Sequence, residues 1–204
     1  ILPANENSSE WQKKLQQEVE QMRKLYGTAE QFLDLFKPEL QLLVAREWRR
    51  AYQGTAPKLS VVAAGYGFGT AEVWTCIQLE DINCFAGVKE KLSIARQKDL
   101  SKLCIAEYGY LRVTELMLCF HRLKCGRYGR FYGSVDPLFI ASALLQFTTE
   151  RLNDLSRIRE EEAKLVKESP VSPTAITYAE YVGQKQQREM KKQRSLSEAQ
   201  SNEE

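Results

Sequence analysis

The hydrophobic residues of this chain recur at steps of three and four, which is the spacing of α-helices that bury one face. In the first such segment the periodic positions are Trp11, Leu15, Val19, Met22 and Tyr26. A serine of the run SSEWQ stands where an N-cap belongs, and Gly27 stands where a helix ends. These signals predict a first helix from about Ser9 to Tyr26.

Two further helices are predicted before residue 57. Thr28 and Gln31 have the spacing of a capping box, which predicts a short second helix. Pro38 has the first-turn position that proline favours, and it predicts a third helix that continues to Gln53. The run GTAP, residues 54–57, then breaks the pattern. We therefore expect an N-terminal helical arm over residues 1–57.

The glycine-rich run KLSVVAAGYGFGTAEVW, residues 58–74, raises the question of a phosphate-binding loop. Gly65, Gly67 and Gly69 have neither the Lys-Ser nor the Lys-Thr that follows a Walker loop. The repeated strand–helix units of a dinucleotide-binding fold are also missing downstream. We interpret these glycines as a hinge between helices, with Thr70 as the cap of the next helix.

Four capped helices are predicted after the hinge, and no segment alternates as a strand does. Ser93 caps the second of them, and the third begins near Thr114 and is apolar on most sides, so we expect it to be buried. Asp136 followed by Pro137 gives the clearest helix start in the chain. The predicted fold is all-α, an irregular multi-helix bundle with a helical core domain over residues 58–168. Residues 169–204 follow two prolines and are polar, which predicts a flexible or partly helical tail.

Composition adds limits on the partners and on the cell compartment. The formal net charge is +2, with 43% hydrophobic and 27% charged residues, so no global field attracts the chain to nucleic acid or membranes. No apolar run approaches the ~18 residues of a membrane span, and the opening residues do not resemble a signal peptide. The five cysteines are odd in number and lie in apolar runs. We expect them to be small core residues of a protein in the reducing cytoplasm.

The sequence gives little support for catalysis or metal binding. His121 is the one histidine, and its apolar neighbours are typical of a residue at the boundary of the core. Cys119, His121 and Cys125 would lie on different faces of one helix, unlike the paired ligands of a zinc site. We therefore expect no enzyme activity, no metal and no cofactor.

The run HRLKCGRYGRFYGSVDP, residues 121–137, contains the candidate binding residues. They are Arg122, Lys124, Arg127, Tyr128, Arg130, Phe131 and Tyr132. Arginine side chains match phosphate oxygens, and aromatic rings stack on unpaired bases, so one interpretation is a site for single-stranded nucleic acid or an acidic partner. The alternative is a structural connector in which Gly126 ends a helix and the rings pack on the core. Four exposed cations on one face would favour the first interpretation, and pairing with Glu107, Glu115 or Glu150 would favour the second.

The region from Trp74 to Asp154 resembles an uncharacterised family of helical proteins that is common in Bacteroidota and in their phages and mobile elements. The resemblance is carried by a pattern of the form EY-YL, K-G-YG-FYG--D and -ER, with an acidic residue between the first two parts. The matching positions are Glu107, Tyr108, Tyr110, Leu111, Glu115, Lys124, Gly126, Tyr128, Gly129, Phe131, Tyr132, Gly133, Asp136, Glu150 and Arg151. The resemblance implies no defined activity, and its mobile-element setting suggests a replication accessory.

Two functional hypotheses follow. The first is a non-enzymatic accessory or adaptor protein that binds single-stranded nucleic acid or a replication protein through residues 122–133. The second is a protein-binding scaffold module in which the same loop is structural.

Overall fold

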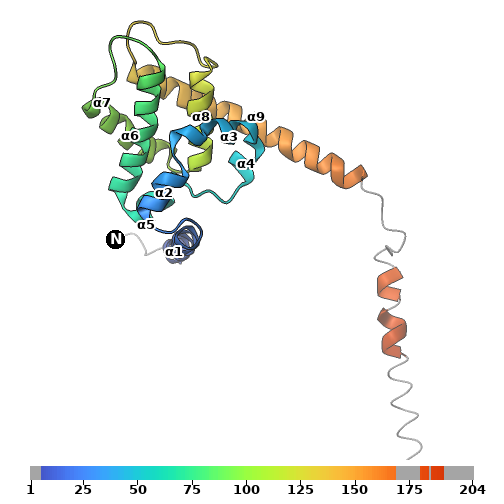
Figure 1. The fold of residues 1–204 in the computed structure, drawn as a ribbon. Helices are drawn as coiled ribbons and strands as arrows, with labels where there is room; N and C mark the ends of the chain where they lie inside the picture. The colour runs from blue at the N-terminus through green and yellow to red at the C-terminus, as the bar shows by residue number, and fades with distance from the viewer. Residues whose placement is uncertain (1–5, 169–179, 184, 191–204) are drawn as a thin grey trace, which may run out of the picture. The chain divides into compact units, whose positions relative to one another are not determined.

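The structure is a computed structural model that describes residues 6–168, 180–183 and 185–190. Its contacts divide the chain into two compact units, Ile1–Ile158 and Arg159–Glu204. The helices, drawn in Figure 1, are α1 (Glu6–Tyr26), α2 (Ala29–Leu35), the 3-10 turn η1 (Pro38–Leu40), α3 (Gln41–Arg46), α4 (Trp48–Gln53), α5 (Leu59–Tyr66), α6 (Phe68–Phe85), α7 (Ile94–Tyr108), α8 (Val113–Lys124) and α9 (Pro137–Glu168). The described ranges contain no strand, which confirms the predicted all-α class.

Helix α8 lies at the centre of the first unit, as its apolar sequence predicts. It contacts α3, α4 and α6. Its buried side chains include Val113, Leu116, Met117, Phe120 and Leu123, none of which is more than 4% exposed. A helix buried on most sides fixes the direction of the loop that follows it, so the position of α8 determines where residues 122–133 lie.

The first 57 residues contribute to the same core. Phe32 is fully buried, and the Phe36 carbonyl accepts hydrogen bonds of 2.9 Å from the Trp74 indole and from the Gln78 amide on α6. The backbone N–H of Val113 also donates to the Pro57 carbonyl at 3.0 Å. The compact unit that contains these contacts continues to Ile158, and the predicted division into residues 1–57, 58–168 and 169–204 stays a prediction.

Several predicted helix starts are confirmed because their signals are local. Thr28 forms the capping box with Gln31, and the Ser93 hydroxyl accepts from the Arg96 N–H. Asp136 Oδ1 accepts a 2.9 Å hydrogen bond from the Leu138 N–H at the start of α9. Each of these caps satisfies an N–H group that lacks a partner inside its own helix.

Other predicted starts are wrong. Helix α1 begins at Glu6, upstream of Ser9, whereas α8 begins at Val113, next to Thr114, so that start is confirmed. The N-cap of α6 is Gly67, at φ 95°, a conformation that favours glycine. Thr70 lies in the first turn instead, where its hydroxyl donates to the Tyr66 carbonyl. The predicted break is therefore present at Gly67 alone, since Gly65 lies inside α5 and Gly69 inside α6, and the cap was placed three residues too late.

The predicted third helix is divided into η1, α3 and α4. Its two halves have separate polar partners: the buried Gln41 amide donates to Gln78 on α6, and Tyr52 donates to Asp154 on α9. The backbone at Glu47 leaves helical geometry between α3 and α4. We attribute the break to these two hydrogen bonds, which hold the two halves to different helices. The spacing of apolar residues alone does not reveal them.

The five cysteines are free, and their environments differ. Cys104 and Cys119 are buried as predicted, and burial raises the pKa of the Cys104 thiol to about 12. Cys84 and Cys125 are exposed, so the prediction of a core position is wrong for these two residues.

The remaining described residues after α9 are short helical segments. No helix in the described ranges is long and apolar enough to cross a bilayer. Residues 180–183 and 185–190 are helical. The rest of the predicted tail, 169–179, 184 and 191–204, lies outside the described residues.

Candidate functional site

The loop between α8 and α9 is held by its own backbone hydrogen bonds. The Gly126 N–H donates to Leu123 and the Arg127 N–H donates to Arg122, which is the Schellman pattern at a helix C-terminus. Gly126 has φ 76° and Gly129 has φ 110°, values that side-chain-bearing residues rarely adopt. The prediction that Gly126 ends the helix is confirmed. The two hydrogen bonds and the positive φ of Gly126 set the direction of the backbone as it leaves α8.

Arg122 lies inside the protein and not on a solvent-facing surface. Its guanidinium donates to Glu150 at 2.9 Å and to Asp154 at 2.8 Å, and its side chain is 11% exposed. It also lies 5.6 Å from the ring centre of Phe147. Burial alone would lower the pKa of Arg122, but the hydrogen bond to Asp154 holds it above its ordinary value. Arg122 is therefore a permanent cation whose charge is matched internally.

Glu150 collects two further donors from the loop. Arg127 Nε lies 2.9 Å from Glu150 Oε1, and the Tyr128 hydroxyl donates to Glu150 Oε2 at 3.1 Å. Tyr128 is buried, and burial raises the pKa of its hydroxyl, so it remains a donor. We call these residues with their partners the Glu150 cluster: Arg122, Arg127, Tyr128, Glu150, Asp154 and Tyr52.

The other candidate residues divide between the interior and the surface. Lys124 Nζ lies 2.6 Å from Asp81 on α6 and 5.6 Å from the ring centre of Phe85, with 16% of its side chain exposed. Phe131 packs edge-to-face on Phe139, with 4.9 Å between ring centres. Arg130 is exposed and has no ion pair within the part of the chain that the structure describes.

The seven candidate residues therefore do not form one exposed cationic face. Arg127, Arg130 and Tyr132 reach solvent, and Tyr132 is 87% exposed. Arg122, Lys124 and Tyr128 point inward to acidic partners that lie far away in the sequence. Pairing with Glu150 is the arrangement that favours the structural interpretation of the loop.

A second buried ion pair joins α9 to α8. Glu115, 1% exposed, accepts from Arg151 at 2.7 Å and from the Arg112 N–H at 2.7 Å. Arg151 also lies over the ring of Tyr110 at 5.9 Å. The residues Tyr110, Glu115 and Arg151 belong to the pattern that carries the family resemblance, and here they attach α9 to the start of α8.

A groove of about 390 Å³ lies beside the Glu150 cluster. Arg122, Arg127 and Arg157 line it with His121 and Trp48. Burial, together with Lys124, lowers the pKa of His121, which makes it a neutral residue at neutral pH. Arg157 pairs with Asp154 at 3.3 Å and lies over Trp48 at 4.7 Å. The cations of this groove thus have internal partners.

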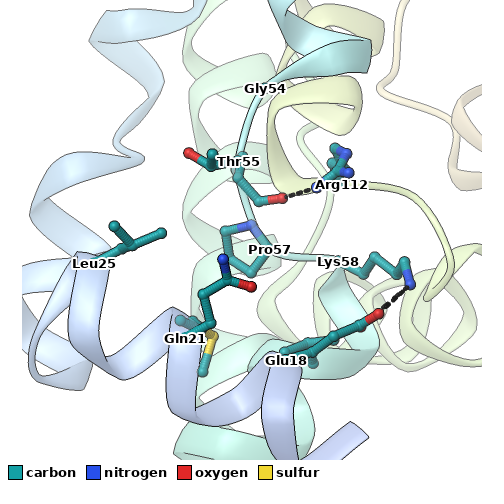
Figure 2. A pocket seen from close by; sticks show the side chains of 11 residues that line it. Glu18, Gln21, Leu25, Gly54, Thr55, Pro57, Lys58 and Arg112 are labelled. Carbon is teal, nitrogen blue, oxygen red and sulfur yellow. Dashed lines mark hydrogen bonds and ion pairs between the residues drawn. The ribbon is translucent and has the colours of Figure 1, made fainter. Parts of the chain in front are cut away.

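A smaller groove of about 260 Å³ separates α1 from residues 54–58, and Figure 2 shows its lining. Lys58 pairs with Glu18 at 3.0 Å across one end, and Arg112 donates to the Ala56 carbonyl at 2.6 Å. These contacts join α1 and the residues before α8 to the GTAP segment. The charged groups Lys58, Glu18 and Arg112 of the groove are thus already used in holding the fold.

No group of three or more His, Cys, Asp or Glu side chains in the described residues has the geometry of a metal site. The sequence places Cys119, His121 and Cys125 close together on one helix. Cys119 is buried, and burial raises the pKa of its thiol well above the ordinary value. Cys125 Sγ lies 3.5 Å from His121 Nε2 at the protein surface.

The outward face of α9 is a further surface of the first unit. Every exposed residue of this helix from Leu138 to Ser156 is uncharged. Its leucines are Leu138, 75% exposed, and Leu145 and Leu152, both 64% exposed. We call the central row the outer α9 stripe: Leu138, Ser142, Leu145, Thr149, Leu152 and Ser156. The apolar spacing of the sequence does not separate this row from the buried residues of the same helix.

These features define an all-α protein with an internally paired basic loop and an uncharged, leucine-bearing helix face. The chain belongs to a family of unknown function, DUF6633, whose model matches residues 91–193. The match includes α7, α8, the basic loop and α9. No curated protein and no solved structure matches the chain. The expectation of an uncharacterised family is confirmed at this level.

Proposed function

We propose that this protein is a non-enzymatic adaptor that binds another polypeptide through the outer α9 stripe, with the basic loop as a structural connector. The observation that carries the proposal is the absence of charge from every exposed α9 position between Leu138 and Ser156. The outer face of an amphipathic helix is ordinarily charged or strongly polar. An exposed face that carries three leucines and no charged residue is instead typical of a surface that a partner covers.

The charged residues in this part of α9 support the same proposal. Glu150 and Asp154 bind the arginines of α8 and the loop, and Arg151 binds Glu115. The helix thus uses its ionic side chains for attachment to its own core. An amphipathic helix is the partner that a straight, apolar helix face fits best.

The free cysteines bear on the cell compartment. We expect the protein to act in the cytoplasm, where its free thiols stay reduced. The resemblance to proteins of Bacteroidota mobile elements suggests a replication protein as the first partner class to test.

The proposal is tested by affinity capture of the tagged full-length chain from its source organism, with nuclease treatment. We expect Leu145→Asp combined with Leu152→Asp to lose partners that the parent retains, because two buried charges oppose an apolar contact. Leu43→Asp is the matched control, since Leu43 is 57% exposed on α3 and lies outside the stripe. Equal capture by the parent and the stripe variant would contradict the proposal.

A second candidate function is binding of single-stranded nucleic acid by the exposed side of the loop. It is favoured by Arg127, Arg130 and Tyr132, which reach solvent together with a ring suited to stacking. Two phosphate contacts would give a log–log salt slope of roughly −1.4 for single strands. Arg127→Ala with Arg130→Ala should remove this dependence, and Lys124→Ala, whose parent side chain pairs with Asp81, should retain it. A parent that does not bind at low salt would exclude this function.

A further inference from the structure

The outer α9 stripe has a regular order of large and small residues. Leucine occurs at 138, 145 and 152, and a small hydroxyl residue occurs at 142, 149 and 156. Seven residues make nearly two helical turns, so both rows follow one face of the helix with a slow drift. Large and small side chains therefore alternate along this face.

A face with this alternation is complementary to itself when two copies meet antiparallel. In one such register Leu138 of one copy lies opposite Ser156 of the other. In the same register Leu145 lies opposite Thr149, and Leu152 lies opposite Ser142. A two-fold axis repeats each contact, because residue i meets j where j meets i. Each leucine then enters the space that a small residue leaves open.

The parallel arrangement lacks this complementarity. With parallel helices in register, leucine would face leucine and serine would face serine. The small hydroxyl residues would then meet in three separate layers and leave spaces there that no leucine fills. The order of residues thus favours the antiparallel pair.

We propose that the outer α9 stripe binds the same stripe of a second copy of this chain, as an antiparallel two-fold dimer. This inference rests on the proposed function, and it names the polypeptide that the stripe binds. Neither copy of the stripe contains a charged side chain, so the contact removes no charge from water.

The expected dimer is weak. The stripe spans 19 residues from Leu138 to Ser156, or about 28 Å at 1.5 Å per residue. A single helix pair of this length buries less than the roughly 1,000 Å² of a stable interface. A groove of about 270 Å³ adjoins the stripe at Leu138, where Leu103 lines it together with the charged residues Arg96 and Asp99. We therefore expect a dissociation constant of about 10–100 μM.

The test is analytical ultracentrifugation of the full-length chain over a concentration series that spans this range. Ser142→Leu places two leucines against each other, and Leu152→Ser leaves two small residues facing a gap. Each single variant should weaken the dimer at least about tenfold, or 1.4 kcal/mol. The combined variant exchanges large and small across the same contact, so it should restore the parent's affinity. Leu43→Ser should dimerise as the parent does.

Restoration in the combined variant is the result that identifies the antiparallel register. Weakening by both single variants without restoration would overturn the register and with it the proposed dimer. A parent that stays monomeric throughout the series would also overturn the dimer. In that case, loss of captured partners by the Leu145→Asp, Leu152→Asp variant would still support the adaptor function, so the two proposals fail separately. Circular dichroism of each variant checks that the helix content is unchanged.

Discussion

Tyr52 and Asp154 lie 102 residues apart in the sequence, and the Tyr52 hydroxyl donates a 2.9 Å hydrogen bond to Asp154 Oδ2. The same oxygen accepts from Arg122 at 2.8 Å, so α4, α8 and α9 meet at one carboxylate. Burial raises the pKa of Tyr52, which keeps its hydroxyl protonated. This junction makes the Glu150 cluster a part of the core, and its energetics can be measured.

Arg122→Met should strongly destabilise the protein. The substitution leaves Glu150 and Asp154 without their shared cation in a largely buried position. Loss of one member of a buried ion pair costs about 3–5 kcal/mol in free energy of unfolding. Arg127→Met is the control, because Arg127 is 51% exposed and its pair should contribute at most about 1 kcal/mol. Urea denaturation measures both, and equal losses would contradict the assignment of Arg122 to the core.

Asp154 should make the stability depend on pH. Burial alone would raise the pKa of Asp154, but hydrogen bonds from Arg122 and Tyr52 outweigh it and lower the pKa. A folded-state pKa below the unfolded value contributes stability that is complete above the ordinary aspartate pKa of about 4. That stability is lost as the pH falls through the folded-state value.

Urea midpoints measured between neutral and acid pH check this dependence. Asp154→Asn should begin from a lower midpoint at neutral pH and decline less steeply on acidification than the parent. Asp99→Asn, at an exposed position of α7, is the control and should follow the parent. Parallel curves for Asp154→Asn and the parent would show that Asp154 does not contribute as described.

Tyr128→Ala should lower the melting temperature, since the ring is buried and its hydroxyl binds Glu150. Truncation of a buried aromatic side chain costs about 3–5 kcal/mol. Tyr128→Phe retains the ring and should cost about 1 kcal/mol for the hydrogen bond. Tyr132→Ala is the matched control, because Tyr132 is 87% exposed. An unchanged melting temperature in Tyr128→Ala would contradict the connector interpretation.

Asp136→Ala should cost about 1 kcal/mol, the usual effect of removing an N-cap. The reason is that the Leu138 N–H would lose its 2.9 Å acceptor at the first turn of α9. Asp136→Asn should behave as the parent, since asparagine caps helices as well as aspartate does. Thermal denaturation of the three proteins checks the prediction, and an unchanged alanine variant would exclude a stabilising cap.

The helical class and several caps could be predicted because their causes lie within a few residues. Thr28, Ser93 and Asp136 each bind an N–H two or three positions away, so a short stretch of sequence contains the whole interaction. The start of α6 at Phe68 escaped prediction because its N-cap is Gly67, which has no side chain that a capping pattern could mark.

The partners of the basic loop could not be predicted in the same way. Arg122 and Glu150 are 28 residues apart, and Lys124 and Asp81 are 43 apart. Cations that are close in sequence suggest a shared surface. In the structure, however, Arg122 and Lys124 point to carboxylates on different helices. The sequence indicates which carboxylates are available, and the packing of α6 and α9 decides which of them are reached.

The outer α9 stripe was hidden by the abundance of apolar residues in its helix. Leu144 and Phe147 are fully buried, whereas the neighbouring Leu145 is 64% exposed. Both faces are apolar over this segment, so spacing alone does not say which one the core covers.

The two faces of α9 also restrict how the helix can change in length. Phe147, Glu150 and Asp154 must meet α4, α8 and the loop, while Leu145, Thr149 and Leu152 point away from them. One inserted residue rotates everything beyond it by about 100°. An insertion between Phe147 and Glu150 would therefore turn both carboxylates away from Arg122 and carry Leu152 out of line with Leu145. Insertion of seven residues would nearly restore the rotation but would shift both carboxylates by about 10 Å along the helix axis, so related chains should vary here by substitution and keep the helix length between Phe147 and Asp154.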